Sequence, residues 1–182
     1  MQIHANDMVF PYGLSRKGLR PSAGYAPPPD NTNGQKRRPC MPFMPWTAEL
    51  ELGLPEIDDQ HRQLVALTNA LHDELSAASP RRSAVGEILE GLVDYTHNHF
   101  IVEEVLFQQH DYAETPAHKA EHDGFTRKAM DLLTRFDGGQ EVMLEALEFL
   151  KQWLVHHICK VDRAYLPFMR EALQAQRTVA LA

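Results

Sequence analysis

Histidine and carboxylate residues recur at helical spacing in the stretch THNHFIVEEVLFQQHDYAETPAHKAEHDGF, residues 96–125, which holds five of the ten histidines of the chain. His99 lies four residues before Glu103, and His118 lies four residues before His122. On a helix, the two members of each pair would project from the same face. Imidazole nitrogens and carboxylate oxygens grouped in this way are typical ligands of a transition metal.

The same residue types interrupt the apolar face of every long helix that the hydrophobic pattern predicts. Seven residues share this property: His61, His99, Glu103, His118, His122, His157 and Asp162. Burying them unpaired would cost about 2 kcal/mol or more each, and the total would exceed the roughly 5–15 kcal/mol by which a domain is usually stable. Core residues satisfied only by one another are therefore the weaker interpretation, and a shared metal centre is the stronger one.

The number of donor atoms suits a pair of metals. If both carboxylates bridge, five imidazoles, two carboxylates and one bridging oxygen would fill eleven of the twelve positions of two six-coordinate ions. The vacant position would suit a small diatomic ligand. Zinc prefers tetrahedral sites, often with thiolate, and magnesium or calcium prefers oxygen ligands. A mixed nitrogen and carboxylate set across a helical bundle therefore favours iron or manganese.

Helical periodicity begins at Trp46 and predicts the elements that would position these ligands. Four long helices are expected over residues 58–75, 80–106, 116–136 and 143–157, with a short C-terminal helix over residues 162–176. Asp58 is the expected N-cap of the first helix, and Ser79 with Pro80 is the expected start of the second. No alternating pattern of convincing length predicts a strand. The short connections favour an all-α, antiparallel up-down-up-down four-helix bundle.

The interval between His157 and Asp162 does not fit an ideal helix. Five residues advance an α-helix by about 140° beyond a full turn, which would point Asp162 away from the face of His157. We therefore expect the backbone to bend or to end between them, and Pro167 lies just beyond.

Residues 1–45 differ in composition from the rest of the chain. They hold eight of the twelve prolines and carry six Lys or Arg residues against two Asp. This composition predicts a disordered basic tail at 1–45, ahead of a helical domain at 46–178. Three interpretations of the tail are open: a solvated extension, an arm that binds a protein partner, or a start of translation at Met41 or Met44.

Charge and cysteine content bound the class of protein. The formal net charge is −7, which argues against nucleic acid as a partner. No run of 18 apolar residues predicts a membrane span, and the N-terminus lacks the apolar segment of a secretory signal. Cys40 and Cys159 stand far apart in dissimilar contexts, so we expect no disulfide framework and a cytoplasmic protein.

Four motifs, in order along the chain, carry a resemblance to a known family. They are PWTAELELGLPEIDDQH, HFIVEE, HKAEH and WLVHHICKVDRAY. The chain from about Met44 to Tyr165 thereby resembles the hemerythrin family, and within it the bacterial hemerythrins. Myohemerythrin, a member of that family, is an up-down-up-down bundle, so the fold expected above and the resemblance are not independent. Tyr112-Ala113 departs from the Tyr-Pro that the family often has at this place.

The resemblance implies a hemerythrin-like di-iron centre, non-heme, with the same seven residues as ligands. It assigns three imidazoles to one iron, namely His118, His122 and His157, and two to the other, namely His61 and His99. Glu103 and Asp162 would bridge the two irons, with an oxo or hydroxo group as the third bridge. The iron with two imidazoles would keep the open position.

The resemblance also implies reversible binding of dioxygen, for transport, storage or delivery to an oxidase, and no enzymatic activity. Four apolar residues next to ligands in the sequence are expected to line the dioxygen pocket: Phe100, Trp153, Leu154 and Ile158. Tyr165 would either hydrogen-bond near the site or fill space. Two alternatives are open: a di-iron oxidoreductase that handles peroxide or nitric oxide or oxidises ferrous iron, and a sensor of dioxygen or iron.

Overall fold

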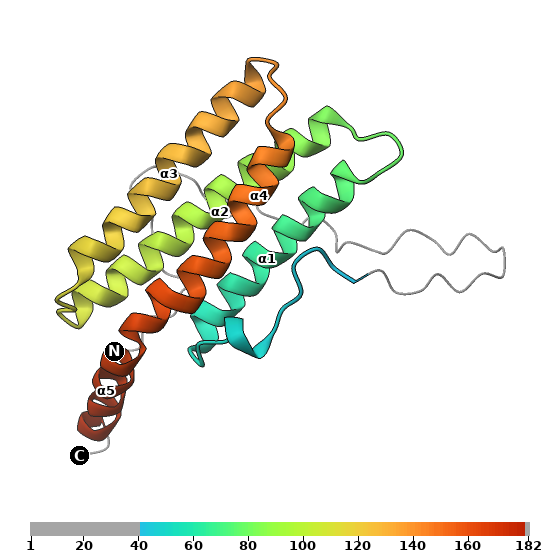
Figure 1. Ribbon diagram of the computed structural model, residues 1–182. Coiled ribbons are helices and arrows are strands. Elements are labelled where there is room, and N and C mark those ends of the chain that lie inside the picture. The colour runs from blue at the N-terminus through green and yellow to red at the C-terminus, as the bar shows by residue number, and fades with distance from the viewer. Residues whose placement is uncertain (1–40, 181–182) are drawn as a thin grey trace, which may run out of the picture. The chain divides into compact units, whose positions relative to one another are not determined.

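Five helices make up most of residues 41–180, the part of the chain that the structure, a computed structural model, describes (Figure 1). They are α1 (Pro55–Leu75), α2 (Arg82–Gln109), α3 (Thr115–Asp137), α4 (Met143–His156) and α5 (Arg163–Ala180). A short 3₁₀ helix, η1 (Ala48–Leu50), precedes α1, and a π-helical segment, η2 (His157–Asp162), joins α4 to α5. No strand occurs between residues 41 and 180, so the predicted all-α fold is confirmed.

Helices α1 to α4 form the predicted up-down-up-down bundle. Short loops at residues 76–81, 110–114 and 138–142 reverse the chain after each of the first three helices. Helix α1 packs against α2 and α4, and α3 packs against the same two helices, so the four surround one core. Helix α5 continues from α4 past η2, as Figure 1 shows. None of the helices within residues 41–180 has the length and apolar content needed to cross a bilayer.

Helix α1 begins at Pro55, which is earlier than predicted. A proline suits the first turn, because its fixed φ is helical and its missing N–H would have no partner there. The prediction of Asp58 as N-cap was wrong, since this residue already lies inside the helix. Its carboxylate instead accepts hydrogen bonds from the N–H groups of Leu52, at 2.7 Å, and Gly53, at 2.9 Å. Asp58 thus ties the preceding loop onto the first helical turn.

The second predicted helix start was also misplaced. Helix α2 begins at Arg82 and not at Pro80. The carboxylate of Glu74, near the end of α1, accepts the backbone N–H of Arg81 at 2.8 Å and its guanidinium as well. This contact holds Arg81 in an extended conformation, so the helix begins at the next residue. The other helix starts agree with prediction to within a residue: α3 starts at Thr115, α4 at Met143 and α5 at Arg163. Helices α2 and α5 extend three and four residues beyond their predicted ends, to Gln109 and Ala180.

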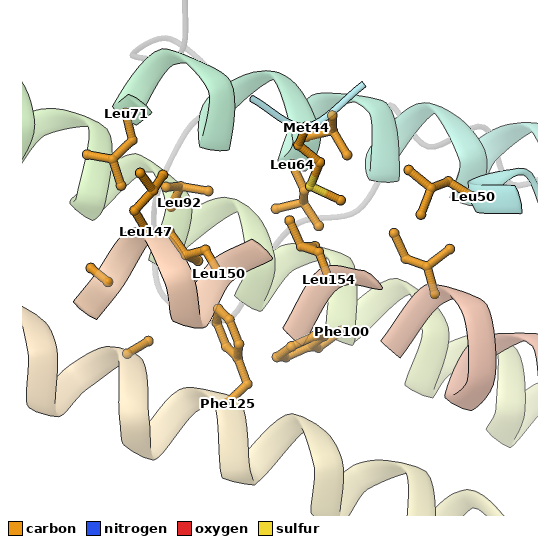
Figure 2. Packing of buried hydrophobic residues seen from close by; sticks show 14 of the residues in the cluster. Met44, Leu50, Leu64, Leu71, Leu92, Phe100, Phe125, Leu147, Leu150 and Leu154 are labelled. Carbon is orange, nitrogen blue, oxygen red and sulfur yellow. The ribbon is translucent and has the colours of Figure 1, made fainter. Parts of the chain in front are cut away.

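An apolar core holds the four helices together (Figure 2). Leu71 of α1, Leu92 of α2, Phe125 of α3 and Leu150 of α4 are each at most 5% exposed. Burying side chains of this size stabilises the fold by about 1.5–3 kcal/mol each. Because successive helices run in opposite directions, the start of α1, the end of α2, the start of α3 and the end of α4 meet at one end of this core.

The segment before α1 packs on the bundle. Met44 is 2% exposed, and its N–H and C=O both bond to the side-chain amide of Asn69 on α1, at 2.8 and 2.9 Å. The contact with the bundle therefore begins ahead of Trp46, the predicted start of the domain. Residues 1–40, which make up most of the predicted tail, lie outside the described residues.

Candidate metal centre

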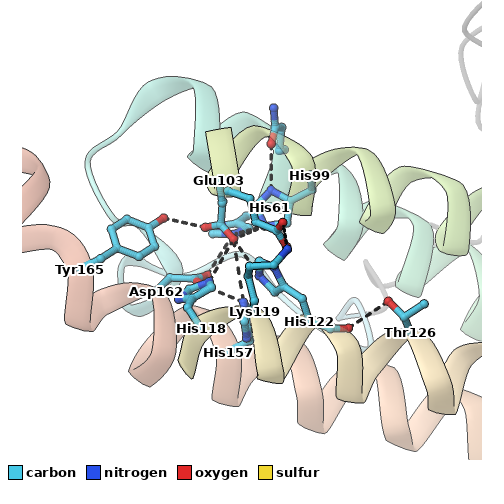
Figure 3. A network of polar contacts seen from close by, with 12 residues as sticks. His61, His99, Glu103, His118, Lys119, His122, Thr126, His157, Asp162 and Tyr165 are labelled. Carbon is cyan, nitrogen blue, oxygen red and sulfur yellow. Dashed lines mark hydrogen bonds and ion pairs between the residues drawn. The ribbon is translucent and has the colours of Figure 1, made fainter. Parts of the chain in front are cut away.

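The seven predicted ligands lie together at one end of the bundle (Figure 3). They come from four segments that are distant in the chain: α1 supplies one, α2 and α3 supply two each, and η2 supplies two. Every one of them is at most 5% exposed. The antiparallel packing explains the convergence, since all four segments reach the same end of the core.

One group of side chains surrounds an oxygen of Glu103. The Nε2 atoms of His122 and His118 lie 3.2 and 3.3 Å from Oε2 of Glu103, and that of His157 lies 4.0 Å away. Three imidazoles and one carboxylate thus converge within a space that a single metal ion could occupy.

A second group lies beside the first and shares Glu103 with it. Nε2 of His61 is 3.2 Å from Nε2 of His99 and 3.3 Å from Oδ2 of Asp162. Nε2 of His99 is 3.6 Å from Oε2 of Glu103. The other oxygen of Asp162, Oδ1, lies 3.0 Å from Nε2 of His157 in the first group. Both carboxylates therefore stand between the two groups of imidazoles.

Several of these close contacts are not aligned as hydrogen bonds. Nε2 of His122, Nε2 of His157 and both carboxylate oxygens of Asp162 are buried without a hydrogen-bond partner among the described residues. Buried polar atoms almost always have a partner, and a missing ion is one recognised explanation when they do not. Short distances without hydrogen-bond geometry are expected if the lone pairs point at common centres, so the donor set fits metal ions.

Electrostatics favour the protonation states that metal ligands need. Burial lowers the pKa of His99 to about 4, which keeps the imidazole neutral. Burial would raise the pKa of Glu103, but the surrounding imidazoles, that of His99 foremost, outweigh it and hold this pKa well below its usual range. Burial and Glu103 likewise act to raise the pKa of Asp162, and His157 and His61 lower it on balance. Ligands that are already deprotonated bind metal without first releasing a proton.

The π-helical segment η2 solves the spacing problem between His157 and Asp162. The predicted departure from an ideal α-helix occurs here, because α4 ends at His156 and the π-helical segment η2 carries the chain into α5. In a π-helix each turn contains more residues than in an α-helix, so five residues come closer to one full turn. Asp162 is thereby returned to the face of His157, and both side chains point into the site.

Tyr165 hydrogen-bonds to the site, which decides between the two roles predicted for it. Its hydroxyl donates to Oε1 of Glu103 at 2.7 Å, and the residue is fully buried. Burial, together with the charges of Glu103 and Asp162, raises the pKa of Tyr165 well above its usual value. The hydroxyl therefore keeps its proton and holds one oxygen of a shared carboxylate.

Two residues behind the ligands were missed by the sequence analysis. Oε1 of Gln60 lies 2.8 Å from Nδ1 of His99, and Oε1 of Glu104 lies 3.1 Å from Nδ1 of His122. Burial acts to raise the pKa of Glu104, but bonds with Lys119 and His122 lower it on balance. Each partner directly precedes or follows a ligand in the sequence. Adjacency to a predicted ligand was the one clue in the sequence, but it does not show which neighbouring helix the side chain faces.

Two of the four residues predicted to line a dioxygen pocket contact candidate ligands, and the other two are buried in the core. The ring of Phe100 stacks on that of His122, and the ring of Trp153 stacks on that of His157, with centroids 3.7 and 4.1 Å apart. Leu154 and Ile158 are buried in the same core cluster. A role in binding dioxygen stays a prediction for all four.

The other histidines within residues 41–180 stand apart from the two groups of candidate ligands. His97 and His156 are exposed, and His72 and His110 are partly exposed. The remaining one, His4, lies outside the described residues. Cys159 is a partly buried free thiol whose Sγ lies 3.5 Å from the carbonyl oxygen of Glu49.

Comparisons with known proteins agree with this geometry. The family model described as the hemerythrin HHE cation binding domain matches residues 52–169. The bacteriohemerythrin of Methylococcus capsulatus is 42% identical over 70% of this chain and 97% of its own, and that of Stenotrophomonas maltophilia is 36% identical over 69% and 80%. A crystal structure of wild-type hemerythrin matches with a TM-score of 0.64 and 42% identity over 69% of this chain and 96% of its own.

Proposed function

Because the chain belongs to the hemerythrin family, we propose that it binds dioxygen reversibly at two iron ions held by the seven buried ligands. The proposed role is transport, storage or delivery of dioxygen to an oxidase, without enzymatic activity. The observation that carries the proposal is that both carboxylates stand between two separate groups of imidazoles. A single-metal site would not need such a shared arrangement.

The two groups of ligands differ in size, and this difference supports an open position. Three imidazoles would hold one ion: His118, His122 and His157. Only two would hold the other, those of His61 and His99. Glu103 and Asp162 would bridge the pair, with an oxo or hydroxo group between the ions. When bound, a pair of ferrous ions supplies the two electrons that reversible binding of dioxygen requires.

The donor types support iron over the common alternatives. The site contains no thiolate, because the described cysteine, Cys159, lies outside both groups. Five nitrogens against two carboxylates would be unusual for magnesium or calcium. Manganese fits the donor set as well, and membership of the hemerythrin family favours iron.

Apolar side chains pack around the polar centre of the site. Phe100 and Trp153 cover the rings of two ligands, and Leu154 and Ile158 are at most 2% exposed. Excluding water strengthens the electrostatic interactions inside the site and prevents proton leakage. Dioxygen is itself apolar, so such a wall would admit it in preference to charged species.

Tyr165 and Glu103 would keep the bridging geometry fixed during binding and release. The tyrosine hydroxyl holds Oε1 of Glu103, while the imidazoles of α3 approach Oε2. A carboxylate fixed from both sides has little freedom to rotate away from its ligands. No other buried acid or base among the described residues faces the two groups, which supports a carrier over an oxidoreductase.

The compartment and the tail are part of the proposal as well. The free thiol of Cys159 supports the reducing cytoplasm as the location. An arm at residues 1–45 that binds a protein partner stays a prediction.

The test is an oxygenation cycle on purified protein. After anaerobic reduction, we expect about two iron ions per chain and a visible charge-transfer band that appears in air, disappears under argon and returns in air. His61→Ala should abolish the band, whereas His97→Ala, which changes an exposed histidine of α2, should leave it intact. Irreversible oxidation with turnover of peroxide or nitric oxide would favour the oxidoreductase instead. Oxygen binding that survives His61→Ala would refute the assignment.

A further inference from the structure

We infer that Glu104 is a positioning residue that strengthens one of the two proposed metal sites selectively, through His122. It rests on the proposed metal pair but not on the binding of dioxygen. The two sites would then differ in the charge behind their imidazoles as well as in the number of imidazoles.

The contacts of the His122 ring carry the inference. Its Nδ1 lies 3.1 Å from Oε1 of Glu104, and its Nε2 lies 3.2 Å from Oε2 of Glu103. A carboxylate can only accept a hydrogen bond, so the proton of the neutral ring belongs on Nδ1. Nε2 then carries the lone pair and faces the site. A carboxylate in this position also makes the imidazole a stronger donor to a metal.

The other imidazoles lack this support. Nδ1 of His99 faces Oε1 of Gln60, at 2.8 Å, which is a neutral amide oxygen. Nδ1 of His61 and Nδ1 of His157 are buried with no hydrogen-bond partner in the described part of the chain. Within residues 41–180, His122 is the one ligand whose Nδ1 pairs with a carboxylate. The negative charge therefore stands behind the group of three imidazoles and not behind the group of two.

Glu104 also forms an ion pair with Lys119, and this pair suggests a competing explanation. The ion pair joins α2 to α3, and its members are 26% and 46% exposed. Both residues line a surface groove of about 510 Å³ between these helices. Exposed ion pairs contribute only about 0.2–1 kcal/mol, because water screens them. If Glu104 served only to tie α2 to α3, removal of Lys119 would have the same effect as removal of the carboxylate.

Metal release separates the two explanations. The metal-loaded wild type, Glu104→Gln and Lys119→Met would be mixed anaerobically with an excess of a ferrous chelator, and each ion followed by absorbance. Glu104→Gln should release one ion about 10–100-fold faster, the usual effect of losing such a partner, and the other at nearly the wild-type rate. Lys119→Met should change both rates by no more than about 5-fold, the size expected of an exposed ion pair worth at most about 1 kcal/mol.

A matched change on the other group gives the complementary result. Gln60→Glu places a carboxylate behind His99, and it should slow release of the ion that the wild type loses more readily. Equal acceleration of both ions in Glu104→Gln, or the same pattern in Lys119→Met, would overturn the inference.

The orientation of His122 can be read without metal or dioxygen. In the metal-free protein, ¹⁵N NMR of the imidazoles should find His122 protonated on Nδ1 in the wild type and in Glu104→Gln, since an amide oxygen also accepts. Glu104→Leu should lose this preference while helical content is unchanged. A preference that persists in Glu104→Leu would refute the positioning role. Failure to bind dioxygen, with these results intact, would instead count against the proposed function.

Discussion

Replacing Tyr165 by phenylalanine removes one hydrogen bond and little else. The residue is fully buried, and the change keeps the ring that packs against Phe107 and His118. The lost bond is a 2.7 Å contact to an oxygen of Glu103, which is ionised and fully buried. Hydrogen bonds to charged groups contribute about 1.5–3 kcal/mol to stability. We therefore expect Tyr165→Phe to destabilise the protein by about that amount.

Urea unfolding followed by circular dichroism would measure the decrease in the free energy of unfolding, and thermal unfolding would measure the accompanying decrease in Tm. For a domain of this size, the expected destabilisation corresponds to a decrease of roughly 5–12 °C in Tm. Tyr112→Phe is the matched control, because its ring lies 6.5 Å from that of Tyr165 and its hydroxyl has no hydrogen bond within the described residues. The control should change stability by less than about 0.5 kcal/mol. Equal effects of the two substitutions would refute the assigned role of the Tyr165 hydroxyl.

Three further predictions concern the metal, the loop before α1 and the effect of acid. Removing the metals with a chelator should lower Tm, because ions present at about 1,000 times their Kd stabilise the fold by roughly 4 kcal/mol. Calorimetry with and without the chelator would measure the change in Tm. Asp58→Ala should cost about 1.5–3 kcal/mol in urea unfolding, because two backbone N–H groups lose their acceptor, whereas Asp59→Ala, at an exposed position, should be nearly neutral. In the metal-free protein, the lowered pKa of His99, about 4, means that the unfolded chain takes the proton first as the pH falls. The contribution of His99 to stability is therefore complete above about pH 6.5 and declines towards pH 4, by at most about 1.4 kcal/mol per pH unit. Urea unfolding at pH 7 and at pH 5 would detect this loss of stability, and His99→Gln would reduce it.

The bundle and the candidate ligands could be predicted because helical periodicity shows which residues share one face of a helix. A residue four positions from another lies on the same side of a helix whatever surrounds it, so His99 with Glu103 and His118 with His122 were readable as pairs. Their place among leucines made burial predictable, and burial made a compensating ion the economical interpretation. The structure confirms the fold and brings these residues together, and their role as metal ligands stays a prediction.

The starts of α1 and α2 were less predictable, because a second signal competes with the predicted one at each of them. Asp58 has the residue type of an N-cap, but Pro55 three positions earlier is equally suited to a first turn, and the structure uses the proline. Before α2, the sequence offered Pro80, and a contact from Glu74 on the preceding helix moves the start to Arg82. Such tertiary contacts are invisible to a reading of local sequence.

The partners behind the ligands could not be predicted for a related reason. Gln60 and Glu104 each project about 100° from the adjacent ligand on the same helix, and each reaches an imidazole on a neighbouring helix. Which neighbour a side chain meets depends on how the helices are rotated about their axes. Spacing along one helix carries no information about that rotation.

The π-helical segment connects stability to function most directly. An uninterrupted α-helix from α4 into α5 would keep its usual hydrogen-bond ladder but would leave Asp162 pointing away from His157. Asp162 is fully buried, at 0% exposure, and its two oxygens face opposite groups of imidazoles. An apolar residue at position 162 would be buried at lower cost than a carboxylate. Packing alone therefore does not account for the wider and rarer helical turn. The wider turn is therefore best understood as a consequence of the site, since it places the second shared carboxylate between the two groups that the proposed metals need.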